Sequence, residues 1–365
     1  MPSRLDADCA GLFCVGFQGT SPSQEVLALI RRGVYGVILF ARNVESAEQV
    51  AELSAELKRA AGRPLLVTVD QEGGRVARLR ARHGFTELPS MRALGQTGDE
   101  VTAFEVGALL GRELRAVGID QDYAPVVDVD TNPMNPVIGD RSLGRDPDLV
   151  GRLGAALARG IQSSGVAACA KHFPGHGDTS QDSHTGLPRL PHSLARLEAV
   201  ELLPFSTLAA AGVASVMTAH VVFEALDPDR PATLSPKVMQ LLRTRCGFHG
   251  PALSDDLEMA AVASHFPLEV AVPGALVAGV DGMLVCHRAD VQGRAIDLTR
   301  EAVERGRVSP ARLAEARARI ARLLSWAGPP PDPALVRPGL RRPGGLALAA
   351  RFPALPAGRD PTAAG

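Results

Sequence analysis

Short apolar segments recur along the chain, and between them lie segments whose apolar residues follow the helical period. The apolar segments are predicted to be strands, because they are rich in β-branched residues and bounded by polar or turn-forming residues. The intervening segments are predicted to be helices. The pattern therefore predicts an α/β protein with eight strands, at residues 11–17, 36–40, 64–70, 119–129, 166–173, 215–222, 251–255 and 282–286.

Start and stop signals support the predicted helices. A capping box that begins at Ser46 opens one helix, and Gly62 closes it. Segments 148–164 and 193–211 are each followed by a glycine, and a Ser-Pro pair places Pro236 at the start of a further helix. Helices are therefore expected to alternate with the strands.

The predicted strands are continuously apolar, which is typical of a parallel sheet covered by helices on both sides. Eight strand–helix units in about 320 residues favour a (β/α)8 TIM-type barrel over the alternative, a doubly wound open sheet. A barrel would gather the polar residues that end the strands around one mouth, whereas an open sheet would spread them along an edge. These polar residues are Asp70, Asp128, Lys171, His172, His220, Asp255, Asp256 and His287.

The character of the sequence changes near residue 328. The last 37 positions, residues 329–365, contain nine of the 28 prolines, many alanines and glycines, and little periodicity. We therefore expect a single barrel domain, residues 1–328, followed by a tail, residues 329–365, that is disordered or loosely docked. Because few contacts should hold this tail, it is also expected to be dispensable for catalysis.

The overall composition is that of an ordinary globular protein. Hydrophobic residues make up 45% of the chain and charged residues 22%, and the formal net charge is −1. This balance gives no reason to expect nucleic acid or a membrane surface as a partner. It is compatible with a neutral or mixed-charge substrate, such as a sugar.

The five cysteines are irregularly spaced, and three of them lie in predicted strands. This pattern indicates small buried residues, and it does not fit a disulfide framework or a zinc site. No signal peptide is visible, and no apolar stretch is long enough to span a bilayer. Together these features predict a reduced, cytoplasmic enzyme.

The segment from Lys171 to His184 places three histidines, a lysine and two aspartates within fourteen residues, directly after the apolar run 166–170 that is predicted to be a strand. Unpaired charges are too costly to bury, so the segment is not core, and Pro174 with two glycines excludes a regular helix. It is therefore predicted to be a long loop at the carboxyl end of a strand, where the active sites of such barrels lie. No HExxH or CxxC pattern accompanies the histidines, so no metal and no cofactor are expected.

Charged residues also follow other predicted strands. Asp255 and Asp256 end the seventh strand, and such a pair holds a metal, acts as acid and base, or supplies a nucleophile. Asp256 fits a helix cap, whereas Asp255 is better placed for chemistry. Asp70 and Arg78 flank a Gly-Gly turn and suit either sugar hydroxyls or a carboxylate, or else form a surface salt-bridge cluster. Arg141 binds an anion or a sugar hydroxyl, or is simply exposed.

The long loop reads KHFPGHG followed by DSH, which resembles the signature of the family 3 glycoside hydrolases, specifically the β-N-acetylglucosaminidases. The similarity extends to about residue 328 and includes the segments 69–76, 88–91, 140–142, 217–220 and 254–257. The resemblance implies that Asp255 is the nucleophile, that His184 is the general acid/base, and that Asp182 orients and charges this histidine. It also implies substrate contacts from Asp70, Arg78, Arg141, Lys171 and His172.

The resembled family removes terminal N-acetylglucosamine from cell-wall fragments during peptidoglycan recycling. The expected enzyme is therefore a retaining exo-β-N-acetylglucosaminidase that acts on muropeptides through a covalent glycosyl-enzyme. Retention requires a carboxylate on one face of the anomeric carbon and a proton donor near the leaving oxygen, and an imidazole can serve as acid and then as base. Gly175 and Gly177 are expected to make residues 173–183 a mobile flap that brings Asp182 and His184 over the sugar.

Several alternatives stay open from the sequence alone. A β-N-acetylglucosaminide phosphorylase or a β-glucosidase would use the same scaffold, and a neutral histidine base would not repel phosphate. A metal-dependent barrel hydrolase and a catalytically inactive sugar-binding barrel are rivals of other kinds. The presence of Asp255, Asp182 and His184 together argues against the inactive barrel. The expected partner is a small carbohydrate or glycopeptide, and a monomer is favoured.

Overall fold

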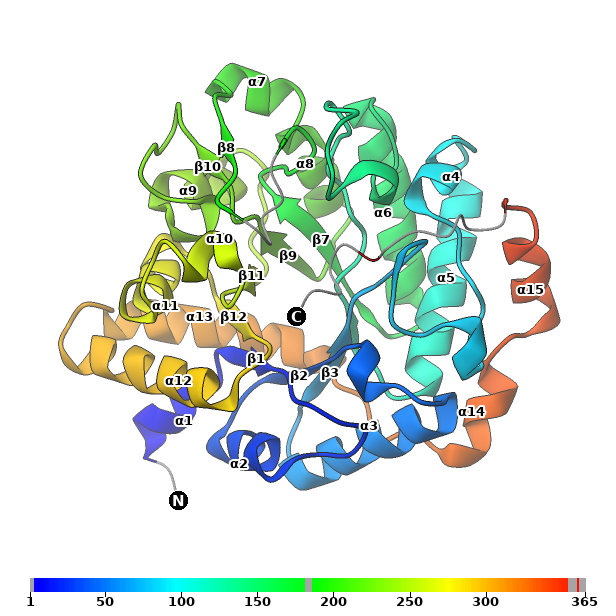
Figure 1. Cartoon of the computed structure of the whole chain (residues 1–365), viewed down its shortest axis with the longest axis horizontal. Helices are drawn as coiled ribbons and strands as arrows, with labels where there is room; N and C mark the ends of the chain where they lie inside the picture. Colours follow the sequence, from blue (N-terminus) through cyan, green and yellow to red (C-terminus); the bar gives the residue numbers. More distant parts are fainter. Residues whose placement is uncertain (1–2, 181–185, 354–359, 361–365) are drawn as a thin grey trace.

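Eight parallel strands close into a barrel at the centre of the computed structural model, which describes residues 3–180, 186–353 and 360 (Figure 1). The order around the barrel is β1-β12-β11-β9-β7-β6-β3-β2, so the first and last strands of the barrel pair with each other. The predicted eight-stranded barrel is confirmed, and the open sheet is excluded. The strands are β1 (Phe13–Val15), β2 (Gly36–Leu39), β3 (Leu66–Val69), β6 (Gln121–Asp122), β7 (Ala167–Phe173), β9 (Ser215–Thr218), β11 (Ala252–Asp256) and β12 (Gly282–Val285).

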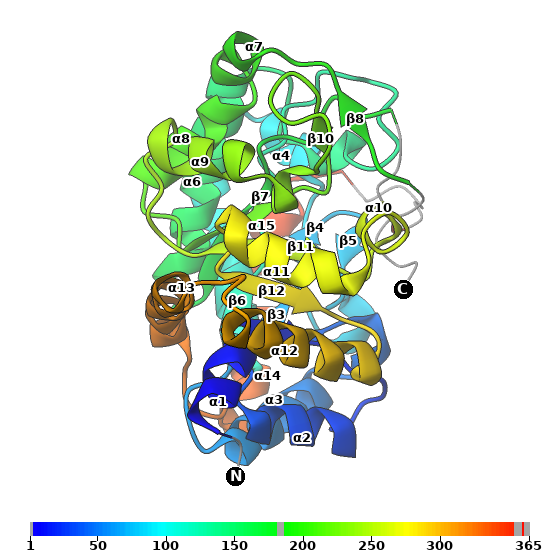
Figure 2. The same cartoon turned by 90° about the vertical axis from the view of Figure 1, so that its left-hand side faces the viewer.

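Helices surround the barrel on its outer side (Figures 1 and 2). The predicted capping box is present, because the Ser46 side chain accepts a hydrogen bond from the Gln49 N–H at 3.1 Å, and Gly62 ends the helix in the left-handed conformation. The long helices are α2 (Gln24–Arg32), α3 (Ala47–Ala61), α5 (Glu100–Ala116), α6 (Pro147–Ser163), α8 (Leu202–Ala210), α9 (Pro236–Thr244), α11 (Leu268–Ala278), α12 (Ala289–Glu304) and α13 (Pro310–Leu323), and α1 (Arg4–Ala10) precedes the barrel.

Helices α5 and α6 pack against each other at glycines. A Cβ atom on Gly107 would lie 2.2 Å from the carbonyl oxygen of Leu157, and one on Gly160 would lie 2.2 Å from that of Phe104. These distances are far below van der Waals contact, so only glycine permits this close packing of the two helix backbones.

One predicted helix is divided in two. Segment 193–211 forms α7 (Leu194–Ala199) and α8, and the chain leaves helical geometry at Val200. Pro204 lies in the first turn of α8, where its missing N–H costs no hydrogen bond. A proline at this position would have broken a continuous helix, which explains the division.

Short elements build the mouth of the barrel at the carboxyl ends of the strands. They include a hairpin after β3 and a two-stranded pair beside the long loop. Among the side chains discussed below, Glu72 lies on one of these elements and Arg141 on another. They are β4 (Gln71–Gly73), β5 (Val76–Ala77), β8 (Arg189–Leu190), β10 (Val222–Phe223), α4 (Met91–Gly95), α10 (Ala260–Ala263), η1 (Ala41–Asn43), η2 (Ala81–His83), η3 (Gly139–Arg141) and η4 (Ala232–Leu234); η5 (Leu324–Trp326) follows α13.

The tail differs from the expectation of a disordered or loosely docked segment. Two helices, α14 (Pro333–Gly339) and α15 (Pro343–Ala349), pack against α5, and α14 also contacts α3. Val336 is buried, and the Arg341 N–H donates to Glu113 at 2.8 Å. The prolines that suggested disorder begin these helices, because proline is favourable in a first helical turn. Each helix is too short to show a clear apolar period in the sequence.

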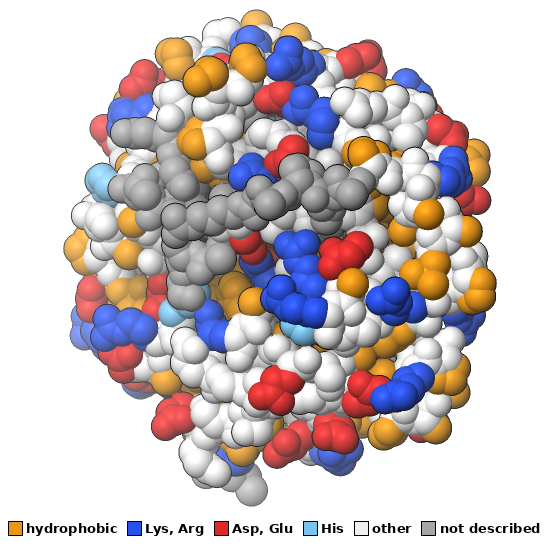
Figure 3. Space-filling view, turned by 45° about the vertical axis from the view of Figure 1, so that its right-hand side comes forward, with side chains coloured by type: hydrophobic (Ala, Val, Ile, Leu, Met, Phe, Trp, Pro, Cys, Tyr) orange, Lys and Arg blue, Asp and Glu red, His pale blue; other side chains and the backbone are white. Residues whose placement is uncertain are grey.

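Charged side chains of both signs are interspersed over the face drawn in Figure 3, as a net charge of −1 would suggest. All five cysteines are buried free thiols, which confirms their interpretation as small core residues. None of the helices in the described ranges combines the length and the apolar character that crossing a membrane requires.

Candidate active site

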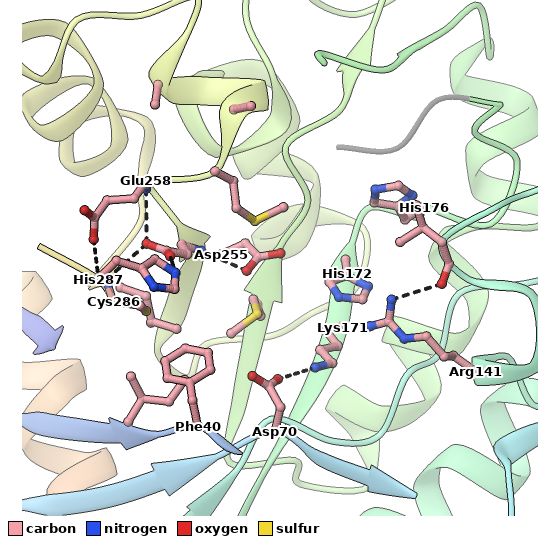
Figure 4. A pocket seen from close by; sticks show the side chains of 18 of the residues that line it. Phe40, Asp70, Arg141, Lys171, His172, His176, Asp255, Glu258, Cys286 and His287 are labelled. Carbon is pink, nitrogen blue, oxygen red and sulfur yellow. Dashed lines mark hydrogen bonds and ion pairs between the residues drawn. The ribbon is translucent and has the colours of Figure 1, made fainter. Parts of the chain in front are cut away.

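One cavity at the mouth of the barrel contains every predicted site residue that the structure describes (Figure 4). Its volume is about 380 Å³. Asp182 and His184 belong to residues 181–185, which lie outside the described residues, so their predicted positions are not tested. The predicted residues that line the cavity are Asp70, Arg78, Arg141, Lys171, His172 and Asp255.

A buried glutamate organises two of the predicted substrate-binding cations. Glu72 accepts two hydrogen bonds from Arg141, each of 2.8 Å, and its Oε1 lies 2.7 Å from Lys171 Nζ. Burial disfavours the charged form of Glu72, but Arg141 and Lys171 outweigh this effect, so its pKa lies well below the ordinary value. Glu72 therefore holds both cations as an ionised partner. The segment 69–76, which contains Glu72, was recognised in the sequence. The sequence did not show that the Glu72 side chain would be the buried acid.

Asp70 and Arg78 come from either side of the β4–β5 hairpin. Lys171 Nζ donates to Asp70 Oδ1 at 2.7 Å, and Arg78 Nη2 lies 3.8 Å from Asp70 Oδ2. Gly73 and Gly74 both have positive φ angles, and a Cβ on Gly73 would lie 2.6 Å from the Pro89 carbonyl oxygen. The Gly-Gly pair thus provides the tight turn that the sequence indicated, and the turn brings Arg78 back to the cavity.

Asp128, which follows β6, positions the two histidines at the start of the long loop. Its Oδ2 lies 2.7 Å from His172 Nδ1, and its Oδ1 accepts the backbone N–H groups of His172 (3.2 Å) and His176 (2.7 Å). Burial opposes ionisation of Asp128, but the neighbouring His172 outweighs it and lowers the pKa of this carboxyl. Burial lowers the pKa of His176 to about 4. His176 is therefore neutral near pH 7 and is not a proton donor there.

The two adjacent aspartates of β11 have different surroundings. Asp255 accepts the Asp256 N–H at 2.8 Å, and burial, which would raise its pKa, is outweighed by His172 and His220, so the pKa lies below its ordinary value. Asp256 instead accepts the N–H of Glu258 at 3.1 Å and lies 3.0 Å from His287 Nε2. Asp256 thus braces the turn after β11, and no helix cap is formed by its side chain, in contrast to the expectation from the sequence.

This arrangement corresponds to a known family. The model of the glycosyl hydrolase family 3 N terminal domain matches residues 5–323. The chain belongs to glycosyl hydrolase family 3. Within the described ranges, no three histidine, cysteine, aspartate or glutamate side chains are arranged to hold a metal ion.

Relatives and solved structures point in the same direction. A β-hexosaminidase from Neisseria meningitidis is 42% identical over 276 residues, which cover 73% of this chain and 75% of the relative. A family 3 β-N-acetylglucosaminidase from Paenibacillus has a TM-score of 0.90 and 41% identity, covering 96% of this chain and 68% of that one. NagZ from Neisseria gonorrhoeae, in complex with N-trifluoroacetyl-D-glucosamine, has a TM-score of 0.80 and 34% identity, covering 94% and 96%. This protein is therefore a glycoside hydrolase of family 3, and its sequence is similar to those of β-hexosaminidases.

The wall of the family 3 site opposite the charged cluster was not predicted as part of the site (Figure 4). The rings of Phe40 and His287 lie 5.5 Å apart, and the Arg42 guanidinium lies 4.3 Å from the Phe40 ring centroid. The Glu258 carboxylate accepts a hydrogen bond from the backbone N–H of His287 at 2.6 Å, and burial raises the pKa of Glu258. Phe40 ends the second predicted strand and His287 follows the eighth, so their positions at strand ends were the available signal.

Asn135 links the loop after β6 to the first part of the long histidine loop. Its side-chain amide donates to the carbonyl oxygens of His176 (2.8 Å) and Gly177 (3.0 Å), and its Oδ1 accepts two backbone N–H groups of its own loop at 2.9 Å. A Cβ on Gly177 would lie 1.8 Å from the Val129 carbonyl oxygen, so the two loops are also in close contact there. The start of the histidine loop is thus held in one place.

Replacing Asn135 with alanine is expected to lower kcat/KM by about 10- to 100-fold, because the loop that carries Asp182 and His184 would lose the hydrogen bonds that fix its first residues. The loss of a buried amide should also lower the free energy of unfolding by about 1–3 kcal/mol. Steady-state kinetics and denaturant unfolding measure the two effects. Asn132→Ala is the graded comparison and should show a smaller loss, since its amide donates to carbonyls of the same loop at the longer distances of 3.2 Å and 3.5 Å. Equal kinetics for wild type and Asn135→Ala would contradict the role.

Proposed function

We propose that this family 3 glycoside hydrolase is a retaining exo-β-N-acetylglucosaminidase that releases terminal N-acetylglucosamine from peptidoglycan fragments. The observation that carries the proposal is the meeting of Asp255 with Asp70, Arg78, Arg141, Lys171 and His172 in a single cavity of about 380 Å³. A cavity of this size suits one sugar residue with its acyl group, as an enzyme that acts on chain ends requires. The similar NagZ structure holds an N-acylglucosamine, which supports this class of ligand.

The polar groups of the cavity suit the hydroxyls of a sugar. Lys171, Arg141 and Arg78 are donors, and Asp70 is an acceptor. Each is already held by an ion pair with another residue, so little side-chain entropy would be lost when the sugar binds. We propose that these residues and His172 bind the terminal sugar, and that their pairing orients it toward Asp255.

The proposed reaction has two steps, with Asp255 as the nucleophile. Its carboxylate attacks the anomeric carbon as the bond to the leaving oxygen breaks, which forms a covalent glycosyl-enzyme. His184, oriented and charged by Asp182, protonates the leaving oxygen in this step. It then takes a proton from water, which attacks the anomeric carbon and releases Asp255. The lowered pKa of Asp255 supports this role, because the carboxylate is ionised at neutral pH.

The biological setting is part of the proposal. We propose a small carbohydrate or glycopeptide from the cell wall as the substrate and the cytoplasm as the location. The five free, buried cysteines support a reducing compartment. We expect the enzyme to act as a monomer without a metal or another cofactor.

Hydrolysis of 4-nitrophenyl N-acetyl-β-D-glucosaminide tests the proposed function. We expect the first released sugar to be the β-anomer by NMR, because two displacements at the anomeric carbon retain its configuration. The matching glucoside should react at least about 100-fold more slowly, since it leaves the groups around the N-acetyl position without a partner. An α-anomer as the first product, or a preference for the glucoside, would contradict the proposal.

The same assay separates the alternatives that the sequence left open. Added inorganic phosphate should leave the product as free N-acetylglucosamine. Accumulation of N-acetylglucosamine 1-phosphate would instead identify a phosphorylase. Full activity after treatment with a chelator is expected, and its loss would favour a metal-dependent hydrolase.

A further inference from the structure

A series of ion pairs runs along the cavity and includes a residue of the tail. Basic and acidic side chains alternate along it, and neighbouring members are within ion-pairing distance of each other. Five members come from the barrel and its loops, and the sixth comes from the tail. In order, they are Arg141, Glu72, Lys171, Asp70, Arg78 and Asp360.

Asp360 adds a negative charge to this series of ion pairs. Arg141, Lys171 and Arg78 supply three positive charges, whereas Glu72 and Asp70 supply two negative ones. The side chains of all three cations are at most 3% exposed, so an unbalanced positive charge here would be poorly screened by water. The carboxylate of Asp360 adds a third negative charge to these five side chains.

Asp360 contacts Arg78 without filling the cavity. Arg78 Nη1 pairs with Asp360, and Nη2 of the same guanidinium faces Asp70. Among the described residues, Arg78 lines the cavity and Asp360 does not. This geometry fits a residue that supports a sugar-binding group, because one carboxylate holds the guanidinium that lines the cavity.

The preceding part of the tail is anchored to the barrel at several points. The helices α14 and α15 pack on α5, and the Arg351 guanidinium donates to Thr102 Oγ1 at 3.0 Å. Leu346, Phe352 and Pro353 adjoin the segment 81–89, which directly follows the strand that leads to Arg78. The tail, as far as residue 353, thus lies beside the segment that follows Arg78 in the sequence.

We propose that Asp360 is a positioning residue of the active site, which holds the Arg78 guanidinium for the terminal sugar. The proposal rests on the proposed function for the role of Arg78 in binding sugar. It replaces the expectation that the tail plays no part in catalysis. Because Asp360 gives Arg78 an anionic partner, it also disfavours binding of another anion at this guanidinium.

Kinetics of Asp360→Asn in the full-length chain test the positioning role. With 4-nitrophenyl N-acetyl-β-D-glucosaminide, KM should rise about tenfold, as expected when a charge-assisted hydrogen bond is weakened, while kcat stays within about twofold. Asp360→Glu should restore most of the affinity. The control is Arg351→Gln, which weakens a tail contact away from the cavity and should behave like wild type. An unchanged KM in Asp360→Asn, or an equal rise in Arg351→Gln, would overturn the proposal.

Binding of inorganic sulfate tests, independently of activity, whether Asp360 is the anionic partner of Arg78. Sulfate raises the Tm of proteins in general, and wild type corrects for this effect. Asp360→Asn should show a larger sulfate-dependent rise in Tm than wild type, and sulfate should inhibit it competitively. The same sulfate response in both proteins would overturn the proposal. If wild type fails to cleave the glycoside, the proposed function fails, and the sulfate measurement alone decides the role of Asp360.

Discussion

An Asp255→Ala variant is expected to lose turnover by about 10⁴-fold or more, which is the scale observed when a covalent nucleophile is removed. The reason lies in the surroundings of the carboxylate. Asp255 lines the cavity with a lowered pKa, and one of its carboxylate oxygens accepts a hydrogen bond from the backbone N–H of Asp256. Steady-state kinetics with 4-nitrophenyl N-acetyl-β-D-glucosaminide measure the loss.

Azide gives the decisive companion measurement for Asp255→Ala. A small anion that enters the vacated space should attack the anomeric carbon and restore turnover, with an α-glycosyl azide as product. Asp256→Asn is the matched control, because Asp256 braces the turn with its backbone partners and His287. It should lose stability and retain most of the turnover per folded molecule. Labelling of Asp256 by a slow fluorosugar substrate would show that the nucleophile is assigned wrongly.

A His184→Ala variant is expected to lose about 10³-fold in kcat/KM on substrates with alkoxide leaving groups. The loss should be under about tenfold with a 2,4-dinitrophenyl leaving group, because that phenolate departs without a proton. Asp182→Asn should lose most of the rate on the alkoxide substrates, since the histidine would lose both its orientation and the charge that raises its pKa. Values of kcat/KM across a series of leaving groups measure the effect.

The control for the histidine loop is Ser180→Ala, an exposed position on the same loop, which should leave the series unchanged. His176→Ala is a less suitable control, because this buried histidine contacts Thr179 and Asp128 and supports the loop. Equal losses on good and poor leaving groups in His184→Ala would show that another group delivers the proton.

The sequence was sufficient to predict the barrel because its strands are buried on both faces. Such strands are continuously apolar and are separated by capped helices, and each of the eight was located. The cavity could also be anticipated, because closing the barrel brings the strand ends Asp70, Lys171 and Asp255 together. In each case a local pattern carries the information about position.

The parts that were missed depend on contacts between distant segments. Glu72 lies in the short strand β4 and Asn135 in the loop after β6, and only the folded structure shows that both side chains are buried and bonded at the site. Asp360 is separated from Arg78 by most of the chain, and no local pattern marks it as an ion-pair partner. The short helices of the tail were hidden by prolines, which begin a helix as readily as they break one.

The closure of the barrel has a consequence for how the protein is made. Phe13 pairs with Met283, so the first strand of the barrel receives one of its two partners only when the last barrel strand has been synthesised. At about 5–20 residues per second, a ribosome exposes the outer edge of Phe13–Val15 for tens of seconds before its partner emerges. An open edge of apolar strand is a template for pairing with other chains. Fragments that end before Gly282 should therefore aggregate during synthesis, and this enzyme should depend on chaperones until its ring is complete.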